Sequence, residues 1–299
     1  MTCINEEKRK NAFLSGYVVK VDFYCYRDET ALFFVHLCSK LVEQDTIKLS
    51  KKLEDNHMLI GHMKEIVRHP VKSFYGESVQ KTRVMEYGLY GDRSHAFLDE
   101  TRPGTFLTIT QFPEMARYKA RFAGEELLEK YPPVEVMTPE GKIFDWGNEE
   151  LTNEIERKSN RQISLITYPP AQVPLGAIEE EHIQLVTDAS LDKLKEIWGK
   201  PEIDYRRFRP NLLISLKEKK PFIEEQWFGK RVRIGNQVEI ELKRHCERCM
   251  IITVDPESAE RDTTLLKTVA KERNNHFGVY ASVIKTGEIN VGDEVFLLE

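Results

Sequence analysis

The sequence predicts a mainly β protein with some helices (α+β), in which β-barrels dominate the architecture. From residue 63 onward, short segments rich in β-branched and aromatic residues alternate with polar positions. Turns containing Gly, Pro or Asn separate these segments at regular intervals. Helical periodicity is confined to a few short stretches, and the sequence contains no internal repeat and no low-complexity segment.

In the first half, the alternation of apolar and polar residues predicts strands, and Pro or Gly marks their ends. Residues 148–158 have the spacing of a short helix. The expected elements are, in order, a strand within 64–73 that leads into a Pro turn, a hairpin of 95–99 and 105–110 connected by 102–104, a hairpin over 134–144 turned at 139–141, a helix over 148–158 and a strand over 163–167.

Pro169, Pro170 and Pro174 form the most linker-like run of the chain. After it, Asp188 is expected to cap a helix, because Leu191 and Leu194 follow at helical spacing. The remaining expected elements are strands over 183–187, 209–214 and 250–254, a hairpin over 232–243 turned at 235–236, a helix over 263–272, and closing strands over 276–285 and 294–298.

Composition narrows the class of protein. With 40% hydrophobic and 31% charged residues, the 299-residue chain is typical of a soluble protein with a substantial core. Its net charge of -5 argues against general nucleic-acid binding, which needs a basic face. No segment approaches the roughly 18 uninterrupted apolar residues of a membrane helix. Five cysteines do not form a disulfide framework, so we expect a cytoplasmic protein.

Residues 1–57 differ in composition from the rest of the chain. Residues 39–57 have the pattern of a polar amphipathic helix. The codons for residues 53–55 can contain GGAGG, a ribosome-binding sequence, a short distance before the Met58 codon. Two interpretations therefore stand: translation begins at Met58 or Met63, or residues 1–57 are a genuine N-terminal extension.

The segment around Cys246 and Cys249 offers the most distinctive chemistry. Zinc would need further Cys or His ligands at suitable spacing, which the sequence lacks. A thioredoxin-type pair opens a helix, whereas a strand is expected after this pair. Two buried structural cysteines are a further alternative, but the charged Glu247 and Arg248 between them argue against a dry core. The cationic neighbours favour binding of an anion.

Three other basic clusters support an anion pocket. Lys72-Ser73 follows a strand and a Pro turn, Arg93 follows the turn-like residues 88–91, and Arg209 belongs to an arginine-rich loop. No Gly-rich phosphate loop of the Walker or dinucleotide type is present in the sequence, so ATP and NAD are not expected.

Six short motifs occur in an order that resembles MOSC-domain proteins, most closely the mitochondrial amidoxime-reducing component and its bacterial relatives. The resemblance covers residues 63–299. The motifs are His69-Pro70-Val71-Lys72-Ser73, Gly91-Asp92-Arg93, Phe208-Arg209-Pro210-Asn211, Cys246-Glu247-Arg248-Cys249 with Thr253-Val254-Asp255-Pro256, Phe277-Gly278-Val279-Tyr280, and Val291-Gly292-Asp293.

The resemblance implies an N-terminal MOSC β-barrel region over 63–168 and a β-barrel MOSC domain over 177–299, which hold a molybdenum cofactor (Mo-molybdopterin) between them. It implies that Cys249 is the catalytic thiolate and the molybdenum ligand, a role that suits a soft sulfur donor. The residues implied to bind the pterin and its phosphate are Lys72, Ser73, Arg93, Arg209, Asn211, Arg248 and Tyr280.

The implied activity is the reduction of N-hydroxylated compounds, with electrons from a separate flavoprotein or ferredoxin-like donor. A sulfur carrier or cofactor-delivery module with a persulfide on Cys249 is the alternative, and a cofactor-storage protein is a third. The family is also associated with pyridoxal phosphate binding, to which no residue of this chain is assigned. The chain departs from close relatives at Glu247 and at Glu180-Glu181, where they carry small hydroxyl residues, so contacts to the cofactor's anionic end are expected to be rearranged.

Overall fold

The structure is a computed structural model that describes residues 10–14, 17–21 and 57–298. Strands β1 (Lys10–Leu14) and β2 (Tyr17–Val21) form an antiparallel hairpin, which is a unit by itself. The helix predicted over 39–57 and the residues before the proposed start codons lie outside the described residues, except for His57 and the β1–β2 hairpin. His57 begins strand β3. This strand opens the second unit, of which the structure describes residues 57–298.

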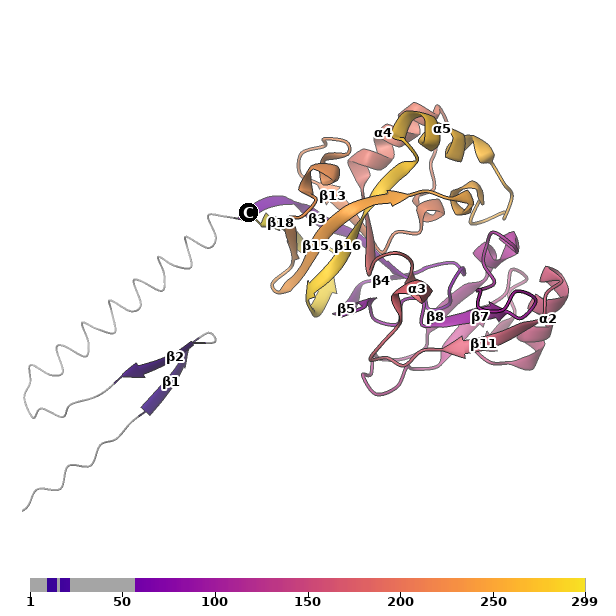
Figure 1. The fold of residues 1–299 in the computed structure, drawn as a ribbon, viewed down its shortest axis with the longest axis horizontal. Coiled ribbons are helices and arrows are strands. Elements are labelled where there is room, and N and C mark those ends of the chain that lie inside the picture. Colours follow the sequence, from indigo (N-terminus) through magenta and orange to yellow (C-terminus); the bar gives the residue numbers. More distant parts are fainter. Residues whose placement is uncertain (1–9, 15–16, 22–56, 299) are drawn as a thin grey trace, which may run out of the picture. The chain divides into compact units, whose positions relative to one another are not determined.

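Seven strands close into a barrel (Figure 1). Around the barrel their order is β13, β12, β16, β15, β14, β18 and β3, and β3 pairs with β13 to complete the ring. Their bounds are β3 His57–Arg68, β12 Ile183–Thr187, β13 Leu212–Leu216, β14 Arg231–Ile234, β15 Val238–Glu247, β16 His276–Lys285 and β18 Glu294–Leu298. This observation confirms the predicted mainly β, barrel-based fold class.

Strand β3 has an unusual place in this barrel. It comes from the beginning of the described unit, yet it pairs antiparallel with β13 on one side and with β18 on the other. Strand β4 (Glu77–Val79) pairs antiparallel with the last three residues of β3 and so extends the sheet beyond the barrel. The single parallel pair in the barrel is β12 with β13, and the chain between them forms α4 (Asp188–Trp198), the helical crossover that parallel strands require.

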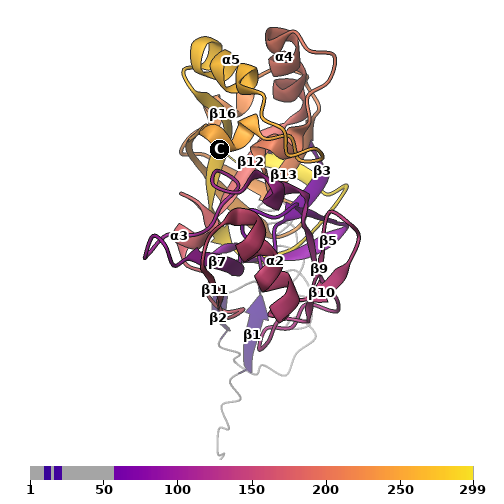
Figure 2. The same ribbon diagram turned by 90° about the vertical axis from the view of Figure 1, so that its right-hand side faces the viewer.

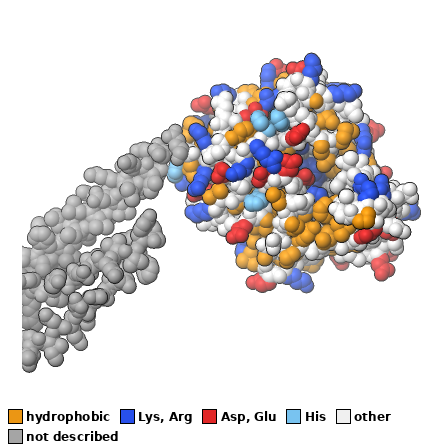
Figure 3. All heavy atoms as spheres, in the orientation of Figure 1, with side chains coloured by type: hydrophobic (Ala, Val, Ile, Leu, Met, Phe, Trp, Pro, Cys, Tyr) orange, Lys and Arg blue, Asp and Glu red, His pale blue; other side chains and the backbone are white. Residues whose placement is uncertain are grey.

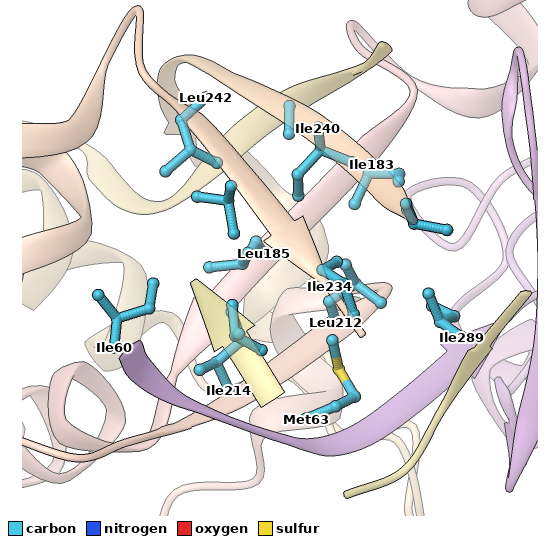
Figure 4. Close-up of a cluster of buried hydrophobic side chains, with 14 of the residues drawn as sticks. Ile60, Met63, Ile183, Leu185, Leu212, Ile214, Ile234, Ile240, Leu242 and Ile289 are labelled. Atoms are coloured by element: carbon cyan, nitrogen blue, oxygen red, sulfur yellow. The ribbon is translucent and has the colours of Figure 1, made fainter. Parts of the chain in front are cut away.

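The barrel interior is apolar. Alternate residues of each strand point inward because successive side chains of a strand face opposite sides of the sheet. Figure 4 shows Met63 of β3 lying against Leu212 and Ile234, so residues from three strands meet at one end of this core. Isoleucine, leucine and valine supply most of the remaining side chains, as expected for a closed sheet with a filled interior.

Three smaller sheets and two helices are built from the chain between β4 and β12, together with β17, which follows β16. Sheets β10-β9-β8 and β11-β7 share an aromatic core with Phe74 between Phe97 and Tyr118, whereas Val84 of β5 and Ile289 of β17 belong to the barrel core. The bounds are β5 Lys81–Met85, β6 Gly88–Leu89, β7 His95–Asp99, β8 Lys119–Phe122, β9 Val134–Met137, β10 Ile143–Asp145, β11 Ile163–Thr167, β17 Gly287–Asn290, α2 Glu149–Ser159 and α3 Leu175–Ile178. The sheets are β10-β9-β8, β11-β7 and β17-β5-β6.

Helices α4 and α5 (Thr263–Arg273) lie together at one end of the unit (Figure 2). Buried Leu194 and Leu265 belong to one cluster with Phe208 and Phe277, so these helices share a core of their own. Residues 57–298 also contain four short 3-10 helices, η1 Pro113–Arg117, η2 Tyr205–Phe208, η3 Ile223–Trp227 and η4 Met250–Thr253. Among the residues described, no helix is both long and apolar enough to span a bilayer.

Most predicted elements are confirmed, including both hairpins turned at 139–141 and 235–236. The strand predicted over 105–110 is wrong. Only Phe106 forms a bridge to β7, and the chain turns at Thr108, where the Gln111 side chain accepts hydrogen bonds from the Thr108 amide and hydroxyl. The ladder partner of β7 is instead β11.

The strand predicted over 250–254 is also wrong, because these residues form η4. The Thr253 hydroxyl donates to the Met250 carbonyl at 2.7 Å and closes the turn. Ile252 packs with the α4–α5 core, while Ile251 packs against the aromatic core. The apolar run therefore spans two cores instead of one sheet.

The cap predicted at the start of α4 is displaced by one residue. Thr187 is the cap, and its hydroxyl accepts from the Ser190 amide. Asp188 is the first residue of the helix, and its carboxylate accepts from the Ser215 hydroxyl at 2.8 Å. Strand β17, which was not predicted, pairs with β5 across a long separation in the sequence.

Candidate functional site

The two cysteines of the Cys-x-x-Cys segment have opposite environments, with Cys246 near the end of β15 and Cys249 immediately before η4. Cys246 is buried, whereas Cys249 is exposed. Arg248 turns inward between them: its Nη1 donates to Cys246 Sγ at 2.7 Å, and its Nη2 donates to the Phe208 carbonyl at 2.7 Å. Cys249 is therefore the thiol of this pair that a ligand can reach.

Cys246 is suited to packing. Burial raises the pKa of its thiol, although Arg248 and Tyr280 act in the opposite direction. Tyr280, from β16, is also buried, and burial raises the pKa of its hydroxyl. The Arg244 guanidinium carbon lies 5.4 Å from the centre of the Tyr280 ring. Cys246, Arg248 and Tyr280 thus form one group, with Cys249 adjoining it in the chain.

Three of the predicted site residues have left-handed backbones. The φ angles are 71° at Ser73, 52° at Arg93 and 56° at Arg209. Each costs about 1–2 kcal/mol for a residue with a Cβ atom. Residues in such conformations are concentrated at functional sites, where the surrounding structure compensates for the cost. This property, which the sequence does not reveal, marks three loops that hold the candidate site.

Asp92 organises the second group of site residues. Its buried carboxylate accepts from the His69 amide at 2.7 Å and from Asn211 Nδ2 at 3.1 Å, and it pairs with the Arg93 guanidinium. Burial alone would raise the pKa of Asp92, but Arg93 and His69 hold it far below its ordinary value. Asp92 is therefore a buried anion that fixes Arg93 in place.

Arg209 lies beside Arg93 without a carboxylate of its own. The Arg93 guanidinium donates to the Arg209 carbonyl at 3.4 Å. Burial, followed by the charge of Arg93, lowers the pKa of Arg209 to about 9. One terminal nitrogen of Arg209 is buried and has no hydrogen-bond partner among the residues that the structure describes. Two guanidinium groups held together in this way attract an anion.

Lys72 links this group to α3. Its Nζ donates to the Ala177 carbonyl at 2.7 Å and to the Ile178 carbonyl at 3.3 Å, and it lies 3.7 Å from a carboxylate oxygen of Glu179. Burial lowers the pKa of Lys72, and Glu179 partly offsets the effect. The charges of Arg93 and Arg209 also act on Lys72, so these three cations belong to one cluster.

Asn211 lies behind this cluster. Its Nδ2 donates to the Val67 carbonyl at 3.3 Å as well as to Asp92, and its Oδ1 accepts from the Gln184 amide at 3.1 Å. The side chain thereby connects β13 to β3 and β12. This geometry favours a role in positioning Asp92.

The acidic residues at which the chain departs from its expected family are turned away from the cations of the site. Glu247 is exposed and accepts from Asn275 Nδ2 at 3.3 Å. Arg244 pairs with Glu180 at 2.6 Å and with Glu181 at 3.4 Å. None of these three carboxylates therefore pairs with Lys72, Arg93 or Arg209 among the described residues.

The structure brings the predicted residues into two groups. We call Lys72, Arg93 and Arg209 the cation cluster, and Cys246, Arg248 and Tyr280 the Cys246 group. Asp92 and His69, which support the cation cluster, were not among the predicted site residues. The signal for Asp92 was its place in Gly91-Asp92-Arg93, because a buried guanidinium needs a buried carboxylate. Ser73 adjoins the cation cluster through Lys72.

The unpaired groups suit an anionic, acceptor-rich ligand. Buried nitrogens without a protein partner include Arg209 Nη2, Arg248 Nε and Gln184 Nε2. All are donors, and Gln184 pairs with Tyr280 in the β12–β16 register. Within residues 57–298, no cluster of three or more His, Cys, Asp or Glu could hold a metal unaided. A soft metal bound by Cys249 fits this site when the cofactor itself supplies further sulfur ligands.

A cavity of about 420 Å³ adjoins the cation cluster. Arg209 and His69 line one side, and Tyr75 and Tyr205 belong to its other walls. Cys249 is not among its lining residues, although Ile251, two residues later, is. Figure 3 shows acidic and basic side chains intermingled over the middle of one face of the molecule.

Comparisons with known proteins identify the family. Residues 60–164 match the MOSC N-terminal beta barrel domain, and residues 172–296 match the MOSC domain. The chain is 26% identical to mitochondrial amidoxime-reducing component 1 of Danio rerio over 81% of this chain and 86% of that protein. It is 24% identical to mitochondrial amidoxime reducing component 2 of Homo sapiens over 79% and 83% of the two chains.

A third relative has a different name. Molybdenum cofactor sulfurase of Danio rerio is 32% identical over 121 residues, which are 36% of this chain and 14% of that protein. The two family matches together cover well over half of the chain and follow the same order as the predicted regions. The protein therefore belongs to the MOSC-domain family, as an N-terminal MOSC β-barrel region followed by a MOSC domain.

Proposed function

We propose that the protein is a molybdenum-cofactor-dependent oxidoreductase that reduces N-hydroxylated compounds with electrons from a separate donor protein. The observation that carries this proposal is the exposed Cys249 thiol. It adjoins Arg248, which donates a hydrogen bond to Cys246 Sγ, and the cation cluster lies nearby. The amidoxime-reducing relatives match this chain over most of their length, which supports the same reaction class here.

The residues of the site would divide the work of holding the cofactor. Cys249 would bind the molybdenum through its thiolate, and the unpaired nitrogens of Arg209 and Arg248 would donate to the anionic and acceptor groups of the cofactor. Asp92 would keep Arg93 in its left-handed loop and directed toward the same anion. Lys72 would add a third charge from its place beside α3.

Three further assignments complete the site. Ser73, Asn211 and Tyr280 would line or support the pterin, with Asn211 acting through Asp92. The bound cofactor would supply a redox centre for a two-electron reduction in which the N–O bond breaks, two protons are taken up and water leaves. Exposure of Cys249 leaves room for a small substrate to approach.

Electrons would come from a flavoprotein or ferredoxin-like partner. Within residues 57–298, Cys246 and Cys249 are the two cysteines, too few to bind an iron–sulfur cluster of the usual type. A reducing compartment such as the cytoplasm would keep the Cys249 thiol available.

The test uses the full chain purified from a host that makes molybdenum cofactor. Bound molybdenum is measured by mass spectrometry, and conversion of benzamidoxime to benzamidine is followed with a chemically reduced viologen as donor. We expect Cys249→Ser to lose both molybdenum and activity, and the matched control Cys246→Ser to retain molybdenum. Undiminished molybdenum and activity in Cys249→Ser would refute the ligand assignment, and wild-type protein without molybdenum would refute the proposal as a whole.

A second candidate function is sulfur transfer, supported by the similarity to molybdenum cofactor sulfurase. In this case Cys249 would bear a persulfide, and the terminal sulfur would be delivered to an acceptor. An exposed thiol suits this role as well as metal binding.

Cyanide distinguishes the two functions. A persulfide releases thiocyanate with cyanide and leaves the Cys249 thiol, in a protein that contains little molybdenum. The reductase predicts near-stoichiometric molybdenum and no cyanide-labile sulfur on Cys249. Thiocyanate release that disappears in Cys249→Ser but persists in Cys246→Ser would favour the sulfur-carrier function.

A further inference from the structure

Glu179 places a negative charge at the cation cluster. It follows α3 directly, and its carboxylate lies 3.7 Å from Lys72 Nζ. Lys72 also donates to the carbonyls of the two residues before Glu179, so the ammonium group is fastened to this turn. The Glu179 side chain is 37% exposed, which leaves it free to rotate toward solvent.

The negative charge of Glu179 affects the arginines of the cation cluster as well as Lys72. Burial opposes the charged form of both Arg93 and Arg209, and Asp92 and Glu179 favour it in both cases. The charge of the same carboxylate also raises the pKa of Cys246 and of Tyr280, which belong to the Cys246 group. Glu179 therefore faces both groups of the candidate site, whereas its neighbours Glu180 and Glu181 pair with Arg244.

Lys72, Arg93 and Arg209 carry three positive charges, and Asp92 and Glu179 together offset two of them. The buried carboxylate of Asp92 is already engaged with Arg93, His69 and Asn211. Arg209 and Lys72 then remain, and both are buried or partly buried cations. Such groups are costly without a counter-charge. Glu179 supplies that charge from within the chain.

We propose that Glu179 is an internal counter-anion: it partly neutralises the cation cluster in the protein without cofactor and competes with the cofactor's phosphate for the same cations. This inference rests on the proposed function, since it assigns the phosphate end of the cofactor to the cation cluster. A carboxylate and a phosphate close to the same cations repel one another. On loading, the phosphate displaces the carboxylate, and the half-exposed side chain moves toward solvent.

Direct binding of inorganic phosphate tests the competition. The full chain is purified from a host that cannot make the cofactor, and phosphate is titrated by calorimetry into wild type, Glu179→Gln and Glu180→Gln. The amide of Glu179→Gln keeps the shape of the side chain and removes its charge. Glu180→Gln removes the same charge from a side chain that is 54% exposed and pairs with Arg244, so it is the matched control.

We expect Glu179→Gln to bind phosphate about fivefold to tenfold more tightly than wild type, after allowance for solvent screening. We expect Glu180→Gln to remain within about twofold of wild type, because its charge is exposed and already paired. Without phosphate, Glu179→Gln should melt at a lower temperature than wild type, and phosphate should close the gap. Unchanged or weaker phosphate binding by Glu179→Gln, or an equal gain in Glu180→Gln, would overturn the proposal.

An Arg209→Gln variant locates the phosphate. Binding should be lost in Arg209→Gln and in the double variant with Glu179→Gln, and binding that survives both changes would also overturn the proposal. Failure of the proposed function appears in a different measurement, as wild-type protein that acquires no molybdenum in a cofactor-competent host. The phosphate titration uses protein without cofactor, so its outcome does not depend on that result.

Discussion

Replacing Asp92 by Asn should cost the protein a large share of its stability at pH 7. The carboxylate is fully buried and pairs with Arg93, which is 2% exposed. Asparagine keeps the shape of the side chain, so the hydrogen bond from the His69 backbone N–H can persist. Its NH2 group, however, would face Arg93 and the Asn211 side chain, which are donors themselves. An uncompensated guanidinium then remains in the interior.

The expected loss follows from known buried pairs. Removing one partner of such a pair costs about 3–5 kcal/mol. For a unit of this size, that loss corresponds to a fall in melting temperature on the order of 10 °C. Asp192→Asn is the matched control, because the Asp192 side chain is 76% exposed and lies 4.0 Å from Lys195. Its cost should stay below about 0.5 kcal/mol.

Urea unfolding at a series of pH values provides the assay. The pKa of Asp92 is depressed in the folded protein, so its contribution is fully present above the ordinary pKa of an aspartate. The contribution is lost as the pH falls toward the depressed folded pKa. The gap between wild type and Asp92→Asn should therefore narrow below about pH 4. An Asp92→Asn protein no less stable at pH 7 than Asp192→Asn, or a gap that is independent of pH, would refute the reasoning.

Three other predictions concern single side chains. Rapid labelling by a thiol reagent should be lost in Cys249→Ser and kept in Cys246→Ser, because Cys249 is exposed and Cys246 is buried; peptide mass mapping identifies the site. Ser73→Gly should be neutral or stabilising and Ser73→Val destabilising by about 1–2 kcal/mol in urea unfolding, since the φ angle of 71° favours glycine. Burial raises the pKa of Glu224, so the wild-type protein should lose stability as the pH rises above the ordinary pKa of a glutamate. Glu224→Gln should remove this pH dependence in melting experiments. An identical pH profile of the two proteins would contradict the prediction.

The sequence was most informative where structure depends on neighbouring residues. The helix predicted over 148–158 is α2, and Gly235-Asn236 turns the β14–β15 hairpin. These features need only a few consecutive residues, so a pattern within one segment predicts them. The resemblance in turn directed attention to Lys72, Arg93 and Arg209, which the structure brings into one cluster.

Features that depend on distant parts of the chain were missed. The run after Cys249 has strand composition but lies between two separate cores, and only their placement decides that it forms η4. The partner of β7 is β11 and not the neighbouring 105–110 segment. Likewise, the place of Glu179 beside Lys72 depends on the path of the chain through α3, which no local pattern specifies.

The position of β3 in the barrel has a consequence for the synthesis of the protein. The ribosome makes this strand before the rest of the unit, yet its two partners are β13, about 145 residues later, and β18, at the end of the described chain. The barrel cannot close until β18 has been made, so β3 must wait with an unpaired edge throughout elongation. Asn211, which ties β13 to β3 and holds Asp92, can reach its place as soon as β13 has been made. Closure of the barrel, and not formation of the Asn211 contacts, is therefore the step that must wait for β18.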